Sequence, residues 1–204
     1  MRTPELLRRW SDLAIPVMAE VPEARRDPLV SRAIAAKSLL SPGASHADLV
    51  AMRTRLQRRM PDDLRAILIA SNGFVIPSLG SGPALFLNSR EIGLFRDCAP
   101  ARYGAWYAIA GRSDPITQRH VIGGEEHERF ELPARDTLHN ALLLSSEHSD
   151  EILLACPDAF HPSRKTEDWT YCKLSSHGQN IRFGSLFMML SYLIERSLPA
   201  IEIN

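Results

Sequence analysis

Residues 64–76, LRAILIASNGFVI, contain the change in hydrophobic periodicity that decides the fold class. Up to Ala70 the apolar residues follow helical spacing, with Leu64, Ile67 and Leu68 on one face. After Gly73 a short apolar run begins at Phe74, and Pro, Ser and Gly bound it, as is typical of a strand. Asn and Gly both tolerate the left-handed conformation that commonly ends a helix. The sequence therefore predicts a helical first third and a β-rich remainder that meet at this turn.

Outward from this turn toward the N-terminus, helix-start signals recur. Thr3-Pro4 and Asp27-Pro28 each combine a capping residue with proline at the first helical position. Ser45 is followed three residues later by Asp48, a variant of the capping box. A fourth helix is expected after Pro61. We therefore expect four helices before Asn72.

Toward the C-terminus, short apolar runs and turn residues indicate strands, followed by one helix. The strands are expected at residues 74–76, 84–87, 106–110, 116–122, 127–132, 138–145, 151–156 and 169–174, with a hairpin turn at 123–124, one turn of helix at 89–95 and a closing helix over 183–196. Because no long helical crossovers separate the strands, the sheet should be largely antiparallel or mixed. The prediction is a single α+β domain over residues 1–204, with N-terminal helices and a C-terminal helix packed on the sheet.

Composition and charge exclude several classes of protein. The net charge is zero, which does not favour non-specific nucleic-acid binding. Three widely spaced cysteines indicate a reducing compartment, and no apolar run is long enough for a signal peptide or a membrane span. We therefore expect a cytoplasmic protein that binds neither nucleic acid nor membrane.

The neutral total conceals an acidic second half. Residues 114–168 hold 12 acidic and 5 basic residues, a net charge of −7, whereas residues 1–65 carry a net +4. A surface of this kind steers a basic partner, although a solvated surface with no partner is the alternative. The candidate partner-binding residues, expected at turns beside the sheet, are Glu125, Glu126, Glu128, Asp150, Glu151, Glu167 and Asp168.

Signatures of catalysis are absent from the sequence. There is no G-x-S-x-G, P-loop, G-x-G-x-x-G or H-E-x-x-H motif. His120 and His127 flank the expected Gly-Gly turn and would face one another across the hairpin; a metal-dependent hydrolase built there is the competing interpretation. The basic cluster of Arg53, Arg55, Arg58 and Arg59 fits the C-terminal end of a helix. We expect no enzyme, no metal and no cofactor.

Two motifs resemble those of the SUKH superfamily, the Smi/Knr type. The first is Gly43-Ala44-Ser45, a helix ending in 56–61 (LQRRMP), and then 71–74 (SNGF); the second is 91–95 (EIGLF). The family's paired central strands resemble the runs 141–145 and 151–157, and its last strand and the start of its closing helix resemble Trp169 and the run 182–187. Residues 41–196 therefore correspond to the family core, and residues 1–40 to a helical extension. The residues that carry the resemblance as structural positions are Gly43, Pro61, Asn72, Gly73, Glu91, Ile92, Gly93 and Trp169. Arg53 and Gln57 depart from the family's usual Glu and Gly, Cys156 from its usual Asp, and residues 97–137 are longer and less recognisable.

The resemblance implies a non-catalytic protein-binding module. Most bacterial members look like immunity proteins, which bind and neutralise a cognate toxin that is commonly encoded by an adjacent gene. The alternative that the family implies is a regulatory or scaffold protein docking on a housekeeping partner, as the Smi/Knr-type cell-wall regulators do. In either case we expect a monomer or a weak homodimer.

Overall fold

The computed structural model describes residues 3–79, 82–110, 119–122, 125–127, 133–146, 150–157, 169–176 and 180–197. Its N-terminal part is helical, as predicted. The helices are α1 (Thr3–Glu20), the short 3₁₀ helix η1 (Glu23–Arg25), α2 (Pro28–Ala36), α3 (His46–Leu56) and α4 (Asp62–Ala70).

Two of the expected start signals, at Asp27 and Ser45, act as caps in the structure, whereas Thr3 is itself the first residue of α1. The Asp27 side chain accepts a hydrogen bond from the Leu29 amide at 2.7 Å, with Pro28 at the first helical position. Ser45 and Asp48 form the complete capping box, because each side chain accepts a bond from the other residue's backbone amide. These local interactions fix where α2 and α3 begin.

Beyond Asn72 the chain forms two sheets. The hairpin β1 (Phe74–Leu79) and β2 (Gly82–Phe86) is antiparallel. The larger sheet has the order β3-β6-β7-β8-β9-β4-β5 and is antiparallel except between β4 and β9. Its strands are β3 (Gly93–Leu94), β4 (Arg119–Ile122), β5 (Glu125–His127), β6 (Leu142–Leu143), β7 (Glu151–Pro157), β8 (Trp169–Ser175) and β9 (Ile181–Phe183). The mixed α+β architecture expected from the sequence is confirmed.

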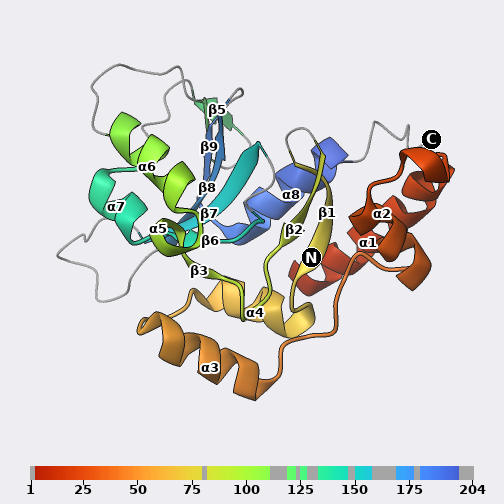
Figure 1. Cartoon of the computed structure of the whole chain (residues 1–204), viewed down its shortest axis with the longest axis horizontal. Helices are drawn as coiled ribbons and strands as arrows, with labels where there is room; N and C mark the ends of the chain where they lie inside the picture. The colour runs from red at the N-terminus through yellow and green to blue at the C-terminus, as the bar shows by residue number, and fades with distance from the viewer. Residues whose placement is uncertain are drawn as a thin grey trace.

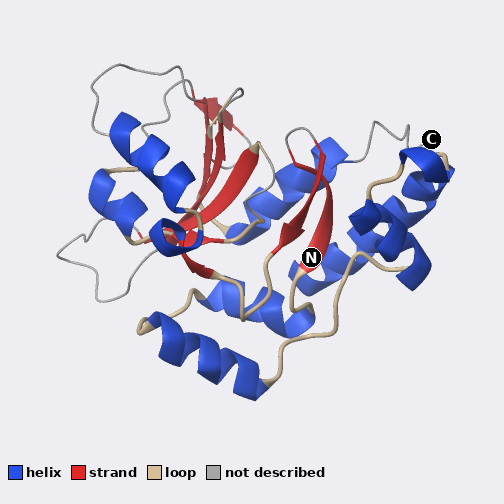
Figure 2. Ribbon diagram, in the orientation of Figure 1, coloured by secondary structure: helices blue, strands red, loops and turns tan. Residues whose placement is uncertain are grey.

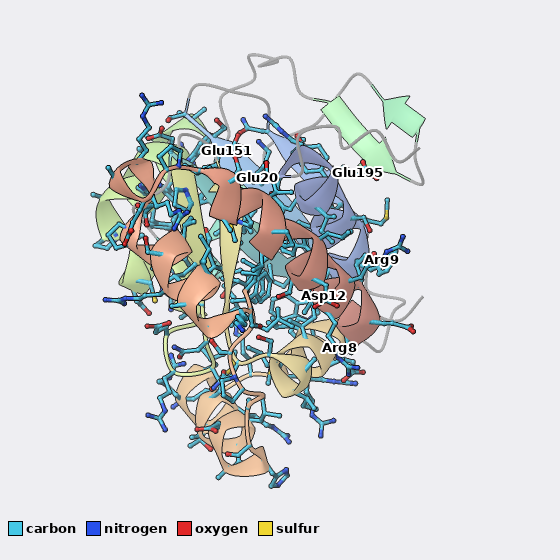
Figure 3. The ribbon with its side chains drawn as sticks, turned by 90° about the vertical axis from the view of Figure 1, so that its right-hand side faces the viewer. Arg8, Arg9, Asp12, Glu20, Glu151 and Glu195 are labelled. Atoms are coloured by element: carbon cyan, nitrogen blue, oxygen red, sulfur yellow. The ribbon has the colours of Figure 1, made fainter. Side chains whose placement is uncertain are left out.

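Helices cover both faces of the seven-stranded sheet (Figure 1). The short helices α5 (Phe95–Cys98), α6 (Pro100–Ile109) and α7 (Arg135–His139) lie on one side. Helix α8 (Leu186–Ser197) lies on the other side, between this sheet and the β1–β2 hairpin (Figure 2). Helix α1 packs on α2, α4 and α8, and its charged residues Arg8, Arg9 and Asp12 are exposed (Figure 3).

One hydrophobic core joins the two sheets and includes the N-terminal extension. Trp10 of α1 packs edge-on against Phe74, which stacks on Phe86 with ring centroids 4.5 Å apart. The Ser11 hydroxyl accepts a buried hydrogen bond from the Leu39 amide. Residues 3–40 therefore contribute to the same core as the rest of the described chain. Among the described helices, none combines the length and the apolar character needed to cross a bilayer.

Several expected elements differ in the structure. Residues 106–110, expected as a strand, belong to α6, because Pro100 starts a helix that alanine-rich sequence then extends. Residues 138–145 divide into the end of α7, a loop and the two-residue β6. The expected helical turn at 89–95 is a turn followed by β3, and the expected start of the last helix belongs to β9. A five-residue apolar run has no periodicity that distinguishes a strand from a helix.

Candidate functional site: the α6 groove and its surroundings

Gly43, Gly73 and Gly93 lie where a side chain would collide with a neighbouring atom or require an unfavourable backbone conformation. A Cβ on Gly43 would lie 2.0 Å from the carbonyl oxygen of Ile69, and one on Gly93 would lie 2.4 Å from Cys98 Sγ. Gly73 has φ +91°, which L side chains rarely adopt. These three positions are structural.

The other motif residues also hold the fold. Asn72 Oδ1 accepts a hydrogen bond from the Ser89 amide at 2.7 Å, and Glu91 Oε2 accepts one from the Asn88 amide at 3.3 Å. The Pro61 carbonyl accepts the first hydrogen bond of α4, and Ile92 is fully buried. Trp169 opens β8 opposite Pro157 and packs against the core. None of these contacts requires a ligand.

Two arginines of the basic cluster tie α3 to the rest of the chain. Arg55 donates to the carbonyls of Ser89 and Ile92, at 3.0 and 2.6 Å. Arg58 donates to the carbonyl and to the side-chain oxygen of Asn140. The role of these two arginines is structural, as expected. It depends on hydrogen bonds to residues distant in sequence, in addition to the helix dipole.

Helix α6 presents an aromatic surface. It carries no fully buried residue, although Tyr103, Trp106 and Tyr107 lie within five positions. The Tyr103 ring packs edge-on against Phe95 and lies 5.3 Å from the Tyr107 ring, centroid to centroid. The Arg135 guanidinium lies 5.1 Å from the Tyr107 ring centroid, a cation–π contact. Desolvation and the neighbouring Tyr107 raise the pKa of the Tyr103 hydroxyl, and Arg96 opposes them.

A groove of about 350 Å³ lies between α6 and the adjoining ends of β7 and β8. Its apolar lining consists of Ala105, Trp106, Ile109 and Ile152. Its polar lining consists of Arg102, Asp150, Ser175, Ser176 and Asn180. An apolar lining with a few polar groups at the edge is the usual composition of a binding site, and this volume is at the small end of the range for ligand pockets.

A buried ion pair lies on the opposite face of the sheet. Lys173 Nζ donates to Glu151 Oε1 at 2.5 Å, with the lysine 1% and the glutamate 8% exposed. Desolvation lowers the pKa of Lys173, and the Glu151 carboxylate opposes that shift. At the end of α8 Arg196 donates to Tyr192 Oη at 2.7 Å, an interaction that raises the pKa of Arg196. The pair thus joins β7 to β8 beneath α8.

A second polar cluster joins α4, β8 and α8. The Tyr171 hydroxyl donates to Asp63 Oδ1, and Asp63 Oδ2 accepts from the Leu186 amide at 3.1 Å. Burial raises the pKa of the Tyr171 hydroxyl, and the negative charge of Asp63 raises it further. Asp63 therefore fixes the start of α8 against the sheet.

Two of the acidic residues expected to form one partner surface, Asp150 and Glu151, lie in different surroundings. Asp150 is exposed and lines the groove, whereas Glu151, expected at an exposed turn, is the buried partner of Lys173. That placement of Glu151 was wrong, because alternate residues of a strand point to opposite faces and β7 begins at this residue. Glu125 and Glu126 belong to β5, an edge strand of the larger sheet. Glu128, Glu167 and Asp168 lie outside the described residues.

The strands expected on either side of residues 123–124 are paired in the structure. Its strands β4 and β5 pair antiparallel, and His120 is the register partner of His127, as predicted. Within the described ranges no cluster of three potential metal ligands occurs. The sequence did not indicate the groove, because it predicts a strand at residues 106–110, where the structure has the second half of α6; Pro100, at the first helical position, was the available signal.

No protein-family model matches this chain, and no curated protein matches its sequence.

Proposed function

We propose that this chain is a protein-binding module without catalytic activity, and that it acts as a cytoplasmic immunity protein. It would bind a cognate toxin, encoded by an adjacent gene, and cover the toxin's active surface. The resemblance of residues 41–196 to the SUKH superfamily supports this proposal. The observation that carries it is the surface of α6.

Residues of the types that dominate protein interfaces gather on that surface. Tyr, Trp and Arg are enriched at binding hot spots. Helix α6 displays Arg102, Tyr103, Trp106 and Tyr107 without burying any of them fully, and Arg135 of α7 lies against Tyr107. Large aromatic side chains left half-exposed beside a groove provide apolar area for a partner at low conformational cost.

Charge supports a basic partner. The net −7 of residues 114–168 would complement the positive surface of a toxin that acts on a polyanion such as a nucleic acid. Complementary charge mainly accelerates association. We therefore expect charge reversal at Glu125, Glu126, Asp150 and Asp168 to slow binding at low salt. Unchanged binding would refute the electrostatic part of the proposal.

Co-expression with the product of the adjacent gene, followed by co-purification, tests the function directly. Once a complex is obtained, Tyr107→Ala should weaken its affinity by more than tenfold. The matched control is Val50→Ala on α3, since Val50 is 49% exposed and Tyr107 is 37% exposed. The control should leave the affinity within about threefold of the original.

The absence of a complex with the adjacent gene product would refute the immunity role. Co-purification with a housekeeping protein, from a locus with no adjacent toxin gene, would instead support the regulatory or scaffold role that the resemblance also implies. Equal effects of the two substitutions would show that binding uses a surface other than α6.

A further inference from the structure

We infer that the outward side of α3 is a second docking surface, which takes an amphipathic helix of a partner protein whose apolar ridge is flanked by carboxylates. The inference does not depend on the proposed function, because that function uses α6. Helix α3 lies at the lower edge of the molecule in Figure 1, beyond α4 and apart from α6.

The outward side of α3 carries no charge. It consists of four exposed residues on the side of the helix away from the core, which we call the α3 face: Ala47, Val50, Ala51 and Thr54. Positions three and four apart adjoin on a helix, so these residues form one continuous surface, and Val50 on it is 49% exposed. A helix side in contact with water normally carries charged residues, as α1 does with Arg8, Arg9 and Asp12 (Figure 3). The α3 face departs from that pattern.

Arginines adjoin the α3 face along both of its edges. Arg53 follows Val50 by three positions, and Arg55 follows Ala51 by four, on the other edge. Both arginines are exposed. Arg55 donates to two main-chain carbonyls through Nη2 alone, so its Nε and Nη1 have no acceptor in the ranges that the structure describes. This guanidinium is therefore held in place before a partner arrives, with donors left for a carboxylate.

The charge along α3 is predominantly positive. Residues 46–59 hold four arginines and one carboxylate, Asp48, a net charge of +3. Asp48 pairs with Arg90 at 3.5 Å, and Arg59 pairs with Asp62 at 3.1 Å. The other three arginines have no carboxylate partner among the described residues: Arg53, Arg55 and Arg58.

Two further carboxylates near α3 are engaged elsewhere. Glu91, in the turn that contacts α3, accepts from the Asn88 amide at 3.3 Å. Asp63 accepts from the Tyr171 hydroxyl and the Leu186 amide, on the side of α4 that meets β8 and α8. A partner that brings carboxylates to the α3 face would therefore meet unpaired guanidiniums, whereas one that brings lysines would meet like charge.

A helix is the partner element that fits the shape of this surface. An α-helix of eleven residues offers a straight and narrow side, and short side chains on it let a second helix approach closely. An amphipathic partner helix would place its apolar ridge over Val50 and its flanking carboxylates beside Arg53 and Arg55.

The first test titrates the full chain with a synthetic helical peptide and follows the amide NMR spectrum. This glutamate peptide, acetylated and amidated, carries leucine along one side and glutamate along both flanks. We expect amide shifts at Ala47, Val50, Ala51 and Thr54. A lysine peptide, with lysine in place of each glutamate, should bind about tenfold more weakly, because it would face the arginines.

Two pairs of variants locate the contact. Val50→Asp should weaken binding of the glutamate peptide about tenfold, whereas Leu13→Asp, on α1 and 41% exposed, should leave it unchanged. Arg53→Gln should weaken it about threefold, and Arg8→Gln, at an exposed arginine of α1, should not change it. All four positions are exposed, and circular dichroism checks that each variant folds.

No binding of the glutamate peptide, equal affinity for the two peptides, or amide shifts confined to α6 would overturn the inference. Equal effects of the α3 and α1 variants would overturn it as well. If the amides of the α3 face shift with protein concentration in the absence of peptide, the occupant is a second copy of the chain, and the acidic partner is wrong. The immunity role is tested separately, on α6.

Discussion

Replacing Asp63 with alanine should destabilise the protein far more than replacing its neighbour Asp62. Asp63 accepts hydrogen bonds from the Tyr171 hydroxyl and from the Leu186 amide, and so links α4 to β8 and α8. Asp62 also lies in the first turn of α4, but its side chain is 78% exposed and pairs only with Arg59, at 3.1 Å, among the described residues. The two substitutions remove the same charge from the same helix end, so their difference isolates the buried contacts.

The expected magnitude follows from those contacts. An orphaned buried hydroxyl donor costs about 1–3 kcal/mol. Loss of a side-chain acceptor at a helix N-terminus typically costs about 1 kcal/mol. Asp63→Ala should therefore lower the free energy of unfolding by about 2–4 kcal/mol, while Asp62→Ala, a surface change, should leave it close to the original value.

Urea denaturation followed by circular dichroism measures both variants. Adding Tyr171→Phe to the Asp63→Ala variant removes the orphaned hydroxyl, so the two changes together should cost less than the sum of their separate effects, by about 1–2 kcal/mol. If Asp63→Ala costs no more than Asp62→Ala, or if the two changes are additive, the assignment of Asp63 as the link between α4, β8 and α8 is wrong.

Three further predictions concern stability. Gln57, the α3 C-cap, has φ +50°, a conformation that glycine adopts without strain, and the resemblance expects glycine at this position. Gln57→Gly should therefore raise the free energy of unfolding by about 1 kcal/mol. A lower urea midpoint would contradict this. Lys173→Met should lower the free energy of unfolding by about 3–5 kcal/mol by removing the ammonium group that faces the buried Glu151 carboxylate, and adding Glu151→Leu should restore most of the loss in the same assay. Burial and Asp63 raise the pKa of Tyr171 above its unfolded value, so the contribution of this tyrosine to stability is complete below about pH 10 and is lost as the pH rises further. Tyr171→Phe should therefore flatten the decline of the free energy of unfolding at alkaline pH. An unchanged slope would count against this assignment.

The sequence was sufficient for features that depend on local chemistry. The helix starts at Asp27 and Ser45 follow from capping groups within three residues, and the Asn72-Gly73 turn separates two unmistakable periodicities. The pairing of His120 with His127 was also predictable, because Gly123-Gly124 in the sequence is typical of a tight hairpin turn, and such a turn sets the register of the flanking strands. In each case the decisive contact lies within a few residues of its signal.

Features that depend on register between distant segments were not predictable. Asp150 and Glu151 are chemically alike neighbours, and only the pairing of β7 with β8 decides which of them meets Lys173. The connection between those strands is eleven residues long, and a connection of that length does not fix register as a tight turn does. Prediction of the groove would also have required the correct assignment of α6. The candidate site was therefore accessible from the sequence only in part, through Asp150.

The difference in burial among residues 150–152 has an evolutionary consequence. Glu151 and Ile152 are buried, while Asp150 is exposed and contributes nothing to the core. Under the immunity role proposed above, substitutions at residue 150 could therefore follow changes in a toxin at little cost to the stability of the fold. A lineage under such pressure should diversify at this position, and at the exposed positions of α6, faster than at either of its anchored neighbours.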